Sequence, residues 1–213
     1  MANEWTDPER AFAYLARLKD IPHRPAGEAT LLSEIPSDAK RVLDLGCGNG
    51  HLLALVLSQC TEATGVGLDV SPPMLDQARE RFRDNPQVSF VEHNMDDPLP
   101  DLGTFDVVVS SFAIHHSTDA RKRELYEEAW SLLEPEGIFA NLEHVSSPNE
   151  RVHLRFVDAM GMTPKDEDPS NILLDVETQL QWLREIGFED VDCYWKWREL
   201  ALLLGRKPKK DER

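Results

Sequence analysis

Hydrophobic and polar positions along the chain follow two different periods, which predict strands and helices in turn. Short apolar runs typical of buried strands occur at residues 41–45, 64–70, 87–92, 105–110 and 138–143. Stretches with apolar residues every three or four positions separate these runs and predict helices, including 51–60 and 119–133. Because strands and helices that alternate at this spacing form right-handed βαβ units, we expect a doubly wound α/β sheet with helices on both faces.

The pattern changes after residue 145. Residues 149–160 have helical spacing, and residues 161–169 predict a mobile acidic loop. An amphipathic helix then runs from residue 175 to Ile186 and ends at Gly187, which suits a C-cap. Two further strand patterns follow at 188–195 and 198–204, and their tight connection predicts an antiparallel hairpin at the edge of the sheet.

Residues 1–36 precede the first strand. Phe12, Leu15 and Leu18 fall on one face of a predicted helix, and a second short helix is expected at 26–33. We expect this segment to cap the ligand-binding edge of the sheet. The planar guanidinium of Arg24 suits a carboxylate there, although a solvated surface position would also explain an arginine.

Residues 42–50 combine an apolar run, the acid Asp44 and three alternating glycines, Gly46, Gly48 and Gly50. They lie between a predicted strand and a predicted helix. Glycine tolerates positive φ and lets a ligand approach the backbone, and the first N–H groups of the helix are free to bind an anionic group. The stretch therefore indicates a site for a nucleotide-type cofactor.

Composition narrows the class of partner. The net charge is −16, the isoelectric point is near 4.8 and the acids are spread through the 213 residues. A strongly acidic protein repels phosphate backbones, so we expect a small-molecule substrate and no nucleic-acid partner. The length supports one α/β domain rather than two.

Cysteine usage and the apolar runs bear on location. Cys47, Cys60 and Cys193 form no CxxC pair, which favours free thiols in a reducing cytoplasm. The first residues resemble no leader peptide, and no apolar run reaches the length of about 18 residues that spans a bilayer. We therefore expect a cytoplasmic protein without a membrane partner. The sequence does not indicate the oligomeric state.

Two kinds of cofactor compete for the glycine turn. The dinucleotide pattern G-x-G-x-x-G begins with Gly46 and Gly48, but His51 stands at its third position. A histidine there argues against NAD or FAD, because the third glycine permits close packing near the pyrophosphate. A smaller adenosine cofactor remains, with Asp69 at the end of the next strand.

Four motifs in order resemble those of class I S-adenosylmethionine-dependent methyltransferases: residues 44–50, 67–71, 105–106 before an apolar strand, and 132–137. The resemblance covers about residues 36–145. It implies a seven-stranded Rossmann-like sheet, mostly parallel with an antiparallel C-terminal hairpin. One domain would comprise a cap (1–36), a cofactor-binding core (37–145), a lid or substrate insert (146–174) and a final helix with the edge hairpin (175–213).

The resemblance also implies S-adenosyl-L-methionine as methyl donor and S-adenosyl-L-homocysteine as product. Asp69 would accept hydrogen bonds from both ribose hydroxyls, and Asp44 would favour the cationic ammonium. Asn94 stands where the family often has an acid that accepts from the adenine amino group. The full set of expected cofactor-binding residues is Asp44, Gly46, Cys47, Gly48, Gly50, Asp69, Val70, Met74, Asn94, Met95, Ser110 and Arg24.

Methyl transfer needs alignment of donor and acceptor, sometimes with a base. The candidate catalytic residues follow the fourth and fifth strands and are His116, His115, Glu143 and His144. Adjacent side chains point in different directions, so only one of His115 and His116 can face the cofactor, and we favour His116. The spacing of the histidines and Glu143 matches no metal signature, and we expect no metal.

Motifs typical of base-, arginine- and arsenite-methylating enzymes are absent from the sequence, which leaves a small organic acceptor. Two alternatives stay open. Residues 21–27 are loosely similar to enzymes that make or use carboxy-S-adenosylmethionine, where Arg24 would pair with the added carboxylate. A non-catalytic regulatory protein that binds the cofactor is the other.

Overall fold

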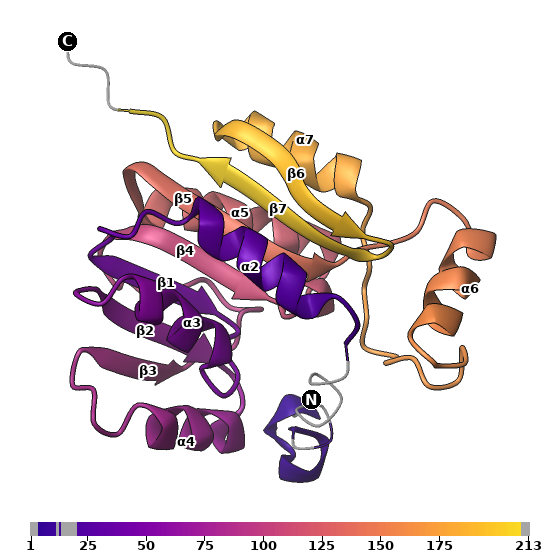
Figure 1. The fold of residues 1–213 in the computed structure, drawn as a ribbon, viewed down its shortest axis with the longest axis horizontal. Helices are drawn as coiled ribbons and strands as arrows, with labels where there is room; N and C mark the ends of the chain where they lie inside the picture. The colour runs from indigo at the N-terminus through magenta and orange to yellow at the C-terminus, as the bar shows by residue number, and fades with distance from the viewer. Residues whose placement is uncertain (1–3, 12, 14–20, 210–213) are drawn as a thin grey trace.

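The computed structural model describes residues 4–11, 13 and 21–209. The expected helix face of Phe12, Leu15 and Leu18 lies outside these residues. One mixed sheet of seven strands, in the order β3-β2-β1-β4-β5-β7-β6, forms the centre of the molecule (Figure 1). The strands are β1 (Arg41–Leu45), β2 (Thr64–Asp69), β3 (Val88–Glu92), β4 (Phe105–Ser111), β5 (Leu133–His144), β6 (Glu189–Trp197) and β7 (Leu200–Arg206).

The strands β3, β2, β1, β4 and β5 pair in parallel, whereas β7 pairs antiparallel with both β5 and β6. This arrangement confirms the doubly wound fold and the antiparallel edge hairpin. The strand order reverses between β1 and β4, and open α/β sheets bind ligands at the carboxyl ends of the strands beside such a reversal.

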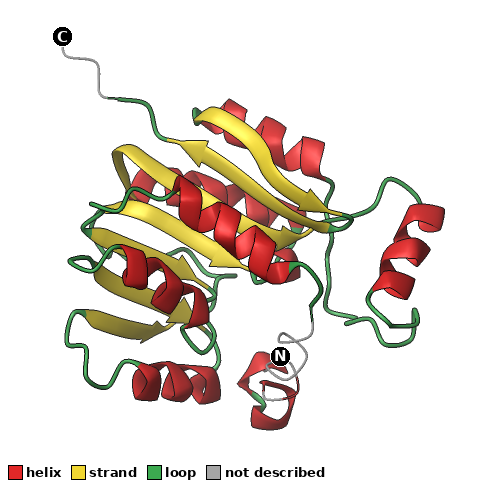
Figure 2. Ribbon diagram, in the orientation of Figure 1, coloured by secondary structure: helices red, strands yellow, loops and turns green. Residues whose placement is uncertain are grey.

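Helices cover both faces of the sheet (Figure 2). The helices are α2 (Arg24–Glu34), α3 (His51–Gln59), α4 (Pro72–Arg81), α5 (Asp119–Leu132), α6 (Glu150–Ala159) and α7 (Val176–Ile186). Apolar residues of α2 and α3 pack on one face of the sheet, and those of α5 and α7 pack on the other. Along β4, Val107 and Val109 belong to the first core and Val108 to the second, as the alternation of side chains in a strand requires.

Helix ends follow the expected chemistry at most positions. Thr118, Asn149 and Asp175 cap α5, α6 and α7 through side-chain oxygens that accept backbone N–H groups. Gly187 ends α7 with φ of 111°, which confirms the C-cap. Ser71 stands at the N-cap of α4, where a serine side chain favours a capping bond, but its hydroxyl makes none.

The boundary of β5 also differs from the expectation. The glycine-containing turn at 135–137 predicts that the strand begins at residue 138, yet β5 begins at Leu133. Leu133 is buried and pairs with Phe105, and the register then shifts before Val107 pairs with Ile138. The turn residues are therefore an irregularity inside a longer strand.

The insert after β5 carries α6, which stands beside the end of the sheet (Figure 1). Phe156 and Val157 are its buried residues, and Phe156 joins the same core as α2 and α3. Among the helices of the residues described, none has the length and apolar character that crossing a bilayer requires.

Candidate cofactor and acceptor site

The glycine turn between β1 and α3 has a backbone that other residues would strain. Gly46 has φ of 68°, and a Cβ built there would lie 2.2 Å from the Cβ of Ala113. Gly48 has φ of 52° and faces open space. The N–H of Cys47 donates to the carbonyl of Leu68 at 2.8 Å, which fixes the turn against β2. The backbone therefore leaves room for a ligand at Gly48.

Two carboxylates flank this turn. Asp69, at the end of β2, accepts the Gly48 N–H through Oδ2 at 2.7 Å and the Ser71 N–H through Oδ1 at 2.9 Å. Each carboxylate oxygen has two acceptor sites, so both oxygens keep capacity for a ligand hydroxyl. Burial raises the pKa of Asp69, and the backbone N–H groups of Ser71 and Gly48 offset part of that rise.

Asp44, on β1, is only 1% exposed, and neither of its carboxylate oxygens accepts a hydrogen bond of normal geometry. Burial and then the negative charge of Asp69 raise its pKa well above the usual range, and the amide of Leu53 offsets only part of that rise. A buried carboxylate without a partner is costly unless a cation or donor binds it.

A cavity of about 500 Å³ opens beside these groups. Most of the sequence-predicted residues line it. They are Arg24, Asp44, Gly46, Cys47, Gly48, Asp69, Val70, Met74, Asn94, Met95 and His116. The remaining predicted residues, Gly50, Ser110, His115, Glu143 and His144, do not line it.

Two of these residues, Ser110 and Gly50, lie outside the cavity lining and make contacts within the protein. The buried Ser110 hydroxyl donates to the carbonyl of Leu45 at 2.8 Å, so the structure does not bring it to the expected position near the cofactor. The next residue, Ser111, lines the cavity instead, because side chains alternate along β4. Gly50 precedes α3 with φ of 73°, and a Cβ there would meet Phe82 at 2.9 Å.

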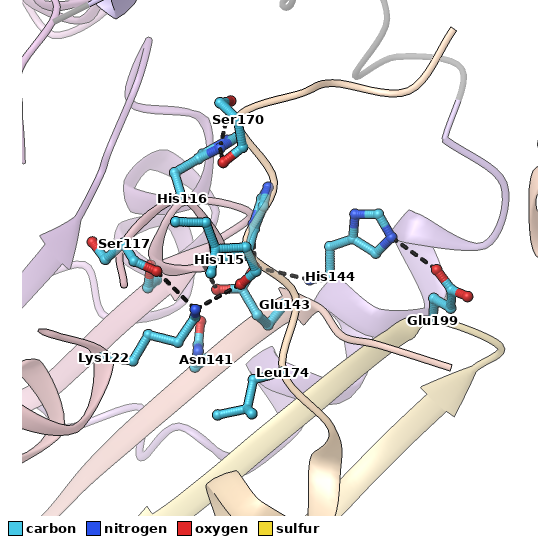
Figure 3. A network of polar contacts seen from close by, with 12 residues as sticks. His115, His116, Ser117, Lys122, Asn141, Glu143, His144, Ser170, Leu174 and Glu199 are labelled. Atoms are coloured by element: carbon cyan, nitrogen blue, oxygen red, sulfur yellow. Dashed lines mark hydrogen bonds and ion pairs between the residues drawn. The ribbon is translucent and has the colours of Figure 1, made fainter. Parts of the chain in front are cut away.

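Three of the four catalytic candidates form a buried network behind the wall (Figure 3). Glu143 accepts the Nδ1–H of His115 at 2.6 Å and the backbone N–H groups of His115 and His144. Burial alone would raise the pKa of Glu143, but its contacts with His115 lower it overall. His144 Nε2 lies 3.2 Å from Glu199, away from the cavity. These groups support the strand ends and do not reach the cavity.

His116 lines the cavity and is held by the insert. Its Nδ1 lies 3.0 Å from the hydroxyl of Ser170, and Figure 3 shows the two side chains directed toward each other. Nε2 is buried without a hydrogen-bond partner. Burial, with the neighbouring His115, lowers the pKa of His116 to about 3, so the imidazole is neutral. The rings of His116 and Trp5 lie 4.8 Å apart.

Arg24 and His51 share one buried acid at the cavity. The Nε of Arg24 donates to Glu28 Oε1 at 2.7 Å, and His51 Nε2 lies 3.1 Å from the same oxygen. Glu28 is 7% exposed, and although burial raises its pKa, the contacts with His51 and Arg24 lower it overall. This acid offsets the charge of Arg24.

Several cavity residues were not expected from the sequence. Ser71, Ser111 and Ser170 line the cavity, and the hydroxyls of Ser71 and Ser111 are buried without partners. Serines carry no distinctive sequence signal, although the strand period places Ser111 on the face opposite to Ser110. The cavity wall therefore has buried polar atoms without hydrogen-bond partners in the described residues, which belong to Asp44, Ser71, Ser111 and His116.

The residues fit an adenosine cofactor with a cationic amino-acid end. Asp44 matches an ammonium, Asp69 matches two ribose hydroxyls, and Gly48 leaves space against the backbone. Val70 and Met74 supply apolar surface. Fold and site together define a Rossmann-like protein with a cavity that fits a nucleoside cofactor at the switch point of its sheet.

Comparison with known proteins shows which families the chain resembles. A model described as a methyltransferase domain matches residues 42–137. A trans-aconitate 2-methyltransferase from Methylobacterium radiotolerans is 32% identical over 152 residues, which cover 70% of this chain and 55% of that protein. A carboxy-S-adenosyl-L-methionine synthase from Nautilia profundicola is 22% identical over 83% of this chain and 81% of its own length.

Among solved structures, human N-acetylserotonin methyltransferase in complex with S-adenosylmethionine has a TM-score of 0.68 at 18% identity, over 96% of this chain and 58% of that chain. This likeness shows the fold. These matches support a class I S-adenosylmethionine-dependent methyltransferase, a family whose cofactor is S-adenosylmethionine. It spans about half the length of several curated relatives that it matches.

Proposed function

We propose that this chain transfers a methyl group from S-adenosylmethionine to a small organic molecule bound in the cavity. The observation that carries the proposal is the unpartnered, buried carboxylate of Asp44 beside Asp69 and the glycine turn. When bound, the cofactor supplies an electrophilic methyl group on a sulfonium with a thioether leaving group. The three free cysteines are consistent with action in a reducing cytoplasm.

The chain's residues then have positioning roles. Asp44 pairs with the ammonium of the cofactor, and Asp69 accepts the ribose hydroxyls while its hydrogen bonds to Gly48 and Ser71 hold the turn. Asn94 accepts from the adenine amino group. Alignment of this kind supplies much of the rate enhancement in a displacement, because donor and acceptor react from one fixed arrangement.

The charges at the cavity determine which methyl acceptors it favours. Asp44, Asp69 and Asp96 line it, and the charge of Arg24 is offset by Glu28. With a net charge of −16, this environment disfavours a multiply charged anion. The trans-aconitate named for the relatives is therefore a weaker choice than an uncharged acceptor.

Isothermal titration with S-adenosylhomocysteine tests the cofactor assignment directly. We expect a stoichiometric complex, and a protein that gives no heat of binding at millimolar ligand contradicts the assignment. Cofactor consumption against a panel of phenols, amines, carboxylates and thiols then tests turnover. Binding without turnover of any acceptor would favour the regulatory, non-catalytic alternative.

The second candidate is chemistry with carboxy-S-adenosylmethionine. It is favoured by the relative from Nautilia profundicola, which this chain covers over most of its length, and by the position of Arg24 at the cavity. The ion pair between Arg24 and Glu28 weighs against it, since an added carboxylate would have to compete with that acid. Mass spectrometry of ligand carried through purification distinguishes the heavier carboxylated cofactor from the methyl form.

A further inference from the structure

The loop that follows α6 brings a carboxylate and a hydroxyl to His116. Ser170 Oγ donates to Asp168 Oδ1 at 2.7 Å and lies 3.0 Å from His116 Nδ1. The Ser170 N–H donates to the same Asp168 oxygen at 2.9 Å. Asp168, Ser170 and His116 therefore form a continuous chain of hydrogen bonds that ends at the cavity wall.

The direction of each bond fixes the proton on the imidazole. Although burial raises the pKa of Asp168, its bonds from Ser170 and the charge of Arg10 lower it overall, so the acid is ionised and can only accept. The single hydroxyl proton of Ser170 is used on Asp168, which leaves Oγ to accept from His116. The carbonyl of Ser170, 3.4 Å from Nδ1, can also only accept. Nδ1 therefore carries the proton, and Nε2 has a free lone pair.

The position of Ser170 does not depend on the imidazole. The Ile172 N–H donates to the carbonyl of His115 at 2.9 Å, and the buried Lys122 donates to the carbonyls of Ile172 and Ser117 at 2.6 and 2.7 Å. These bonds fasten the loop to the segment that carries His116. The loop is therefore a fixed support for the ring.

The surroundings of His116 indicate which acceptor it receives. Its Nε2 is buried without a partner, so a bound molecule must supply a donor to satisfy it. Trp5 and Phe112 line the same cavity and offer aromatic surface, and Ser111 adds a hydroxyl without a partner. A flat apolar molecule with a hydroxyl group matches these groups.

We propose that Asp168 and Ser170 are positioning residues that hold His116 with an unprotonated Nε2, and that this nitrogen takes the proton of an uncharged aromatic hydroxyl during methyl transfer. The proposal rests on the proposed function and names its acceptor class. A serine–aspartate pair contributed by the insert thereby prepares the histidine contributed by the short helical turn after β4.

The step balances in atoms and charge. A bond forms between the acceptor oxygen and the methyl carbon, while the carbon–sulfur bond breaks and leaves its electron pair on sulfur. The hydroxyl becomes strongly acidic as the oxygen–carbon bond forms, so its proton moves to Nε2 although the pKa of His116 is lowered to about 3, and its bonding pair stays on oxygen. The positive charge lost from sulfur reappears on the imidazolium of His116, where Asp168 offsets it through Ser170. The proton leaves to water when the product departs.

Nitrogen NMR of protein labelled at histidine tests the positioning without any cofactor. We expect the His116 ring, assigned by the His116→Gln variant, to show a protonated Nδ1 and a bare Nε2 between about pH 6 and 8. Ser170→Ala should give a mixture of tautomers. A protonated Nε2 in the unaltered protein overturns the proposal.

Turnover of a phenol provides the second readout. Ser170→Ala should lower kcat by roughly 10- to 100-fold while KM for S-adenosylmethionine stays within about twofold, because only the orientation of His116 is lost. Ser170→Thr keeps the hydroxyl and should restore most of the rate. Thr163→Ala is the matched control, since Thr163 makes the same kind of bond to Asp166 in the same loop at an exposed position. Equal rates for Ser170→Ala and Thr163→Ala contradict the positioning role.

Cofactor binding and the role of Ser170 toward His116 are tested by separate outcomes. If S-adenosylhomocysteine does not bind, the proposed function is wrong, and the histidine spectrum still decides whether Ser170 sets the tautomer. If the cofactor binds and a carboxylate or thiol is methylated at a rate that Ser170→Ala leaves unchanged, the methyltransferase assignment stands and the hydroxyl acceptor is wrong.

Discussion

We expect Asp44 to make opposite contributions to folding and to cofactor binding. Its buried carboxylate has no hydrogen-bond partner, and its pKa is raised well above the ordinary value. A folded state that holds a proton more tightly than the unfolded state is stable at low pH and loses that stability as pH rises through the raised pKa. At neutral pH the cofactor-free protein therefore carries a cost that a bound ammonium relieves.

Asp44→Asn should reveal both contributions. We expect the midpoint of thermal unfolding without ligand to rise by about 2–4 °C at pH 7.5, which corresponds to roughly 1 kcal/mol, and the gain to shrink toward pH 5. Affinity for S-adenosylhomocysteine should fall by tenfold or more. Thermal scans over pH and calorimetric titration measure the two effects.

Asp106 provides the matched control for this substitution. Its Oδ2 accepts the backbone N–H groups of Lys40 and Arg41 at 2.7 and 2.9 Å, so its charge is satisfied. Asp106→Asn should destabilise the protein and leave affinity for S-adenosylhomocysteine unchanged. A loss of stability in Asp44→Asn of the same size would show that Asp44 has a ligand-independent structural role.

Asp69 should dominate recognition of the ribose. Asp69→Ala removes the acceptor for two hydroxyls and also frees the N–H groups of Gly48 and Ser71, so affinity for S-adenosylhomocysteine should fall by more than tenfold, about 1.4 kcal/mol or above. 5′-Methylthioadenosine, which lacks the amino-acid end but keeps the ribose, should lose comparable affinity. An unchanged affinity for both ligands removes Asp69 from the site.

Single residues also mark the limit of prediction from sequence. The glycine turn and both acids could be placed because each has a specific backbone or charge requirement. Ser110 could not be separated from Ser111, since a shift of one residue along a strand exchanges the cavity face for the opposite one. The Ser170 contact joins positions far apart in the chain, and no local pattern reports it.

At the scale of elements, strands and helices with a strong apolar period were predicted nearly to their ends. The start of β5 was not, because pairing of Leu133 with Phe105 outweighs the local turn signal at residues 135–137. Ser71 is a similar case: the residue type favours a cap, yet its hydroxyl belongs to the cavity wall and makes no bond to α4. Contacts with distant parts of the chain therefore determine both the start of β5 and the environment of the Ser71 hydroxyl.

The docking of α6 depends on a pair of acids and a histidine. His153 Nδ1 lies 3.0 Å from Glu199, which is fully buried between β6 and β7, and Nε2 lies 3.2 Å from Glu167. Glu199 also contacts His144 at 3.2 Å. Burial lowers the pKa of His153, but the two glutamates raise it overall.

This arrangement predicts a pH dependence of stability. Because the folded-state pKa of His153 is raised, its contribution is complete below about pH 6.5 and is lost as pH rises through the raised value. The free energy of unfolding should exceed that of His153→Gln by no more than about 1 kcal/mol at pH 6, and by less at pH 8.5. Urea titrations of both proteins measure this difference.

Glu199→Gln tests the origin of that effect. Replacement of the carboxylate by an amide keeps the shape of the side chain and removes the charge that favours protonated His153. In this background the change in unfolding free energy caused by His153→Gln should be independent of pH. A change that keeps its pH dependence would assign the effect to Glu167 instead.

At the scale of the whole molecule, the N-terminal segment and the insert meet over His116. Arg10 donates to Asp168 at 2.9 Å and lies 4.8 Å over the ring of Trp5, which in turn contacts His116. The two segments are separated by the whole cofactor-binding core in sequence. The sequence pattern predicted that each segment covers the site, but their mutual contact arises only once the sheet between them in sequence has folded.

This contact predicts that Arg10 controls access to the acceptor end of the cavity and not cofactor affinity. Arg10→Ala should raise KM for the acceptor by roughly threefold to tenfold, and should speed cleavage of the 161–170 loop in limited proteolysis, because a partly exposed ion pair contributes up to about 1 kcal/mol. Affinity for S-adenosylhomocysteine should change by less than twofold, since the residues proposed to bind it, Asp44 and Asp69, do not contact Arg10. Arg155→Ala on the exposed face of α6 removes the same charge nearby and should change none of these quantities. If the two variants behave alike, the N-terminal segment covers the site without controlling it.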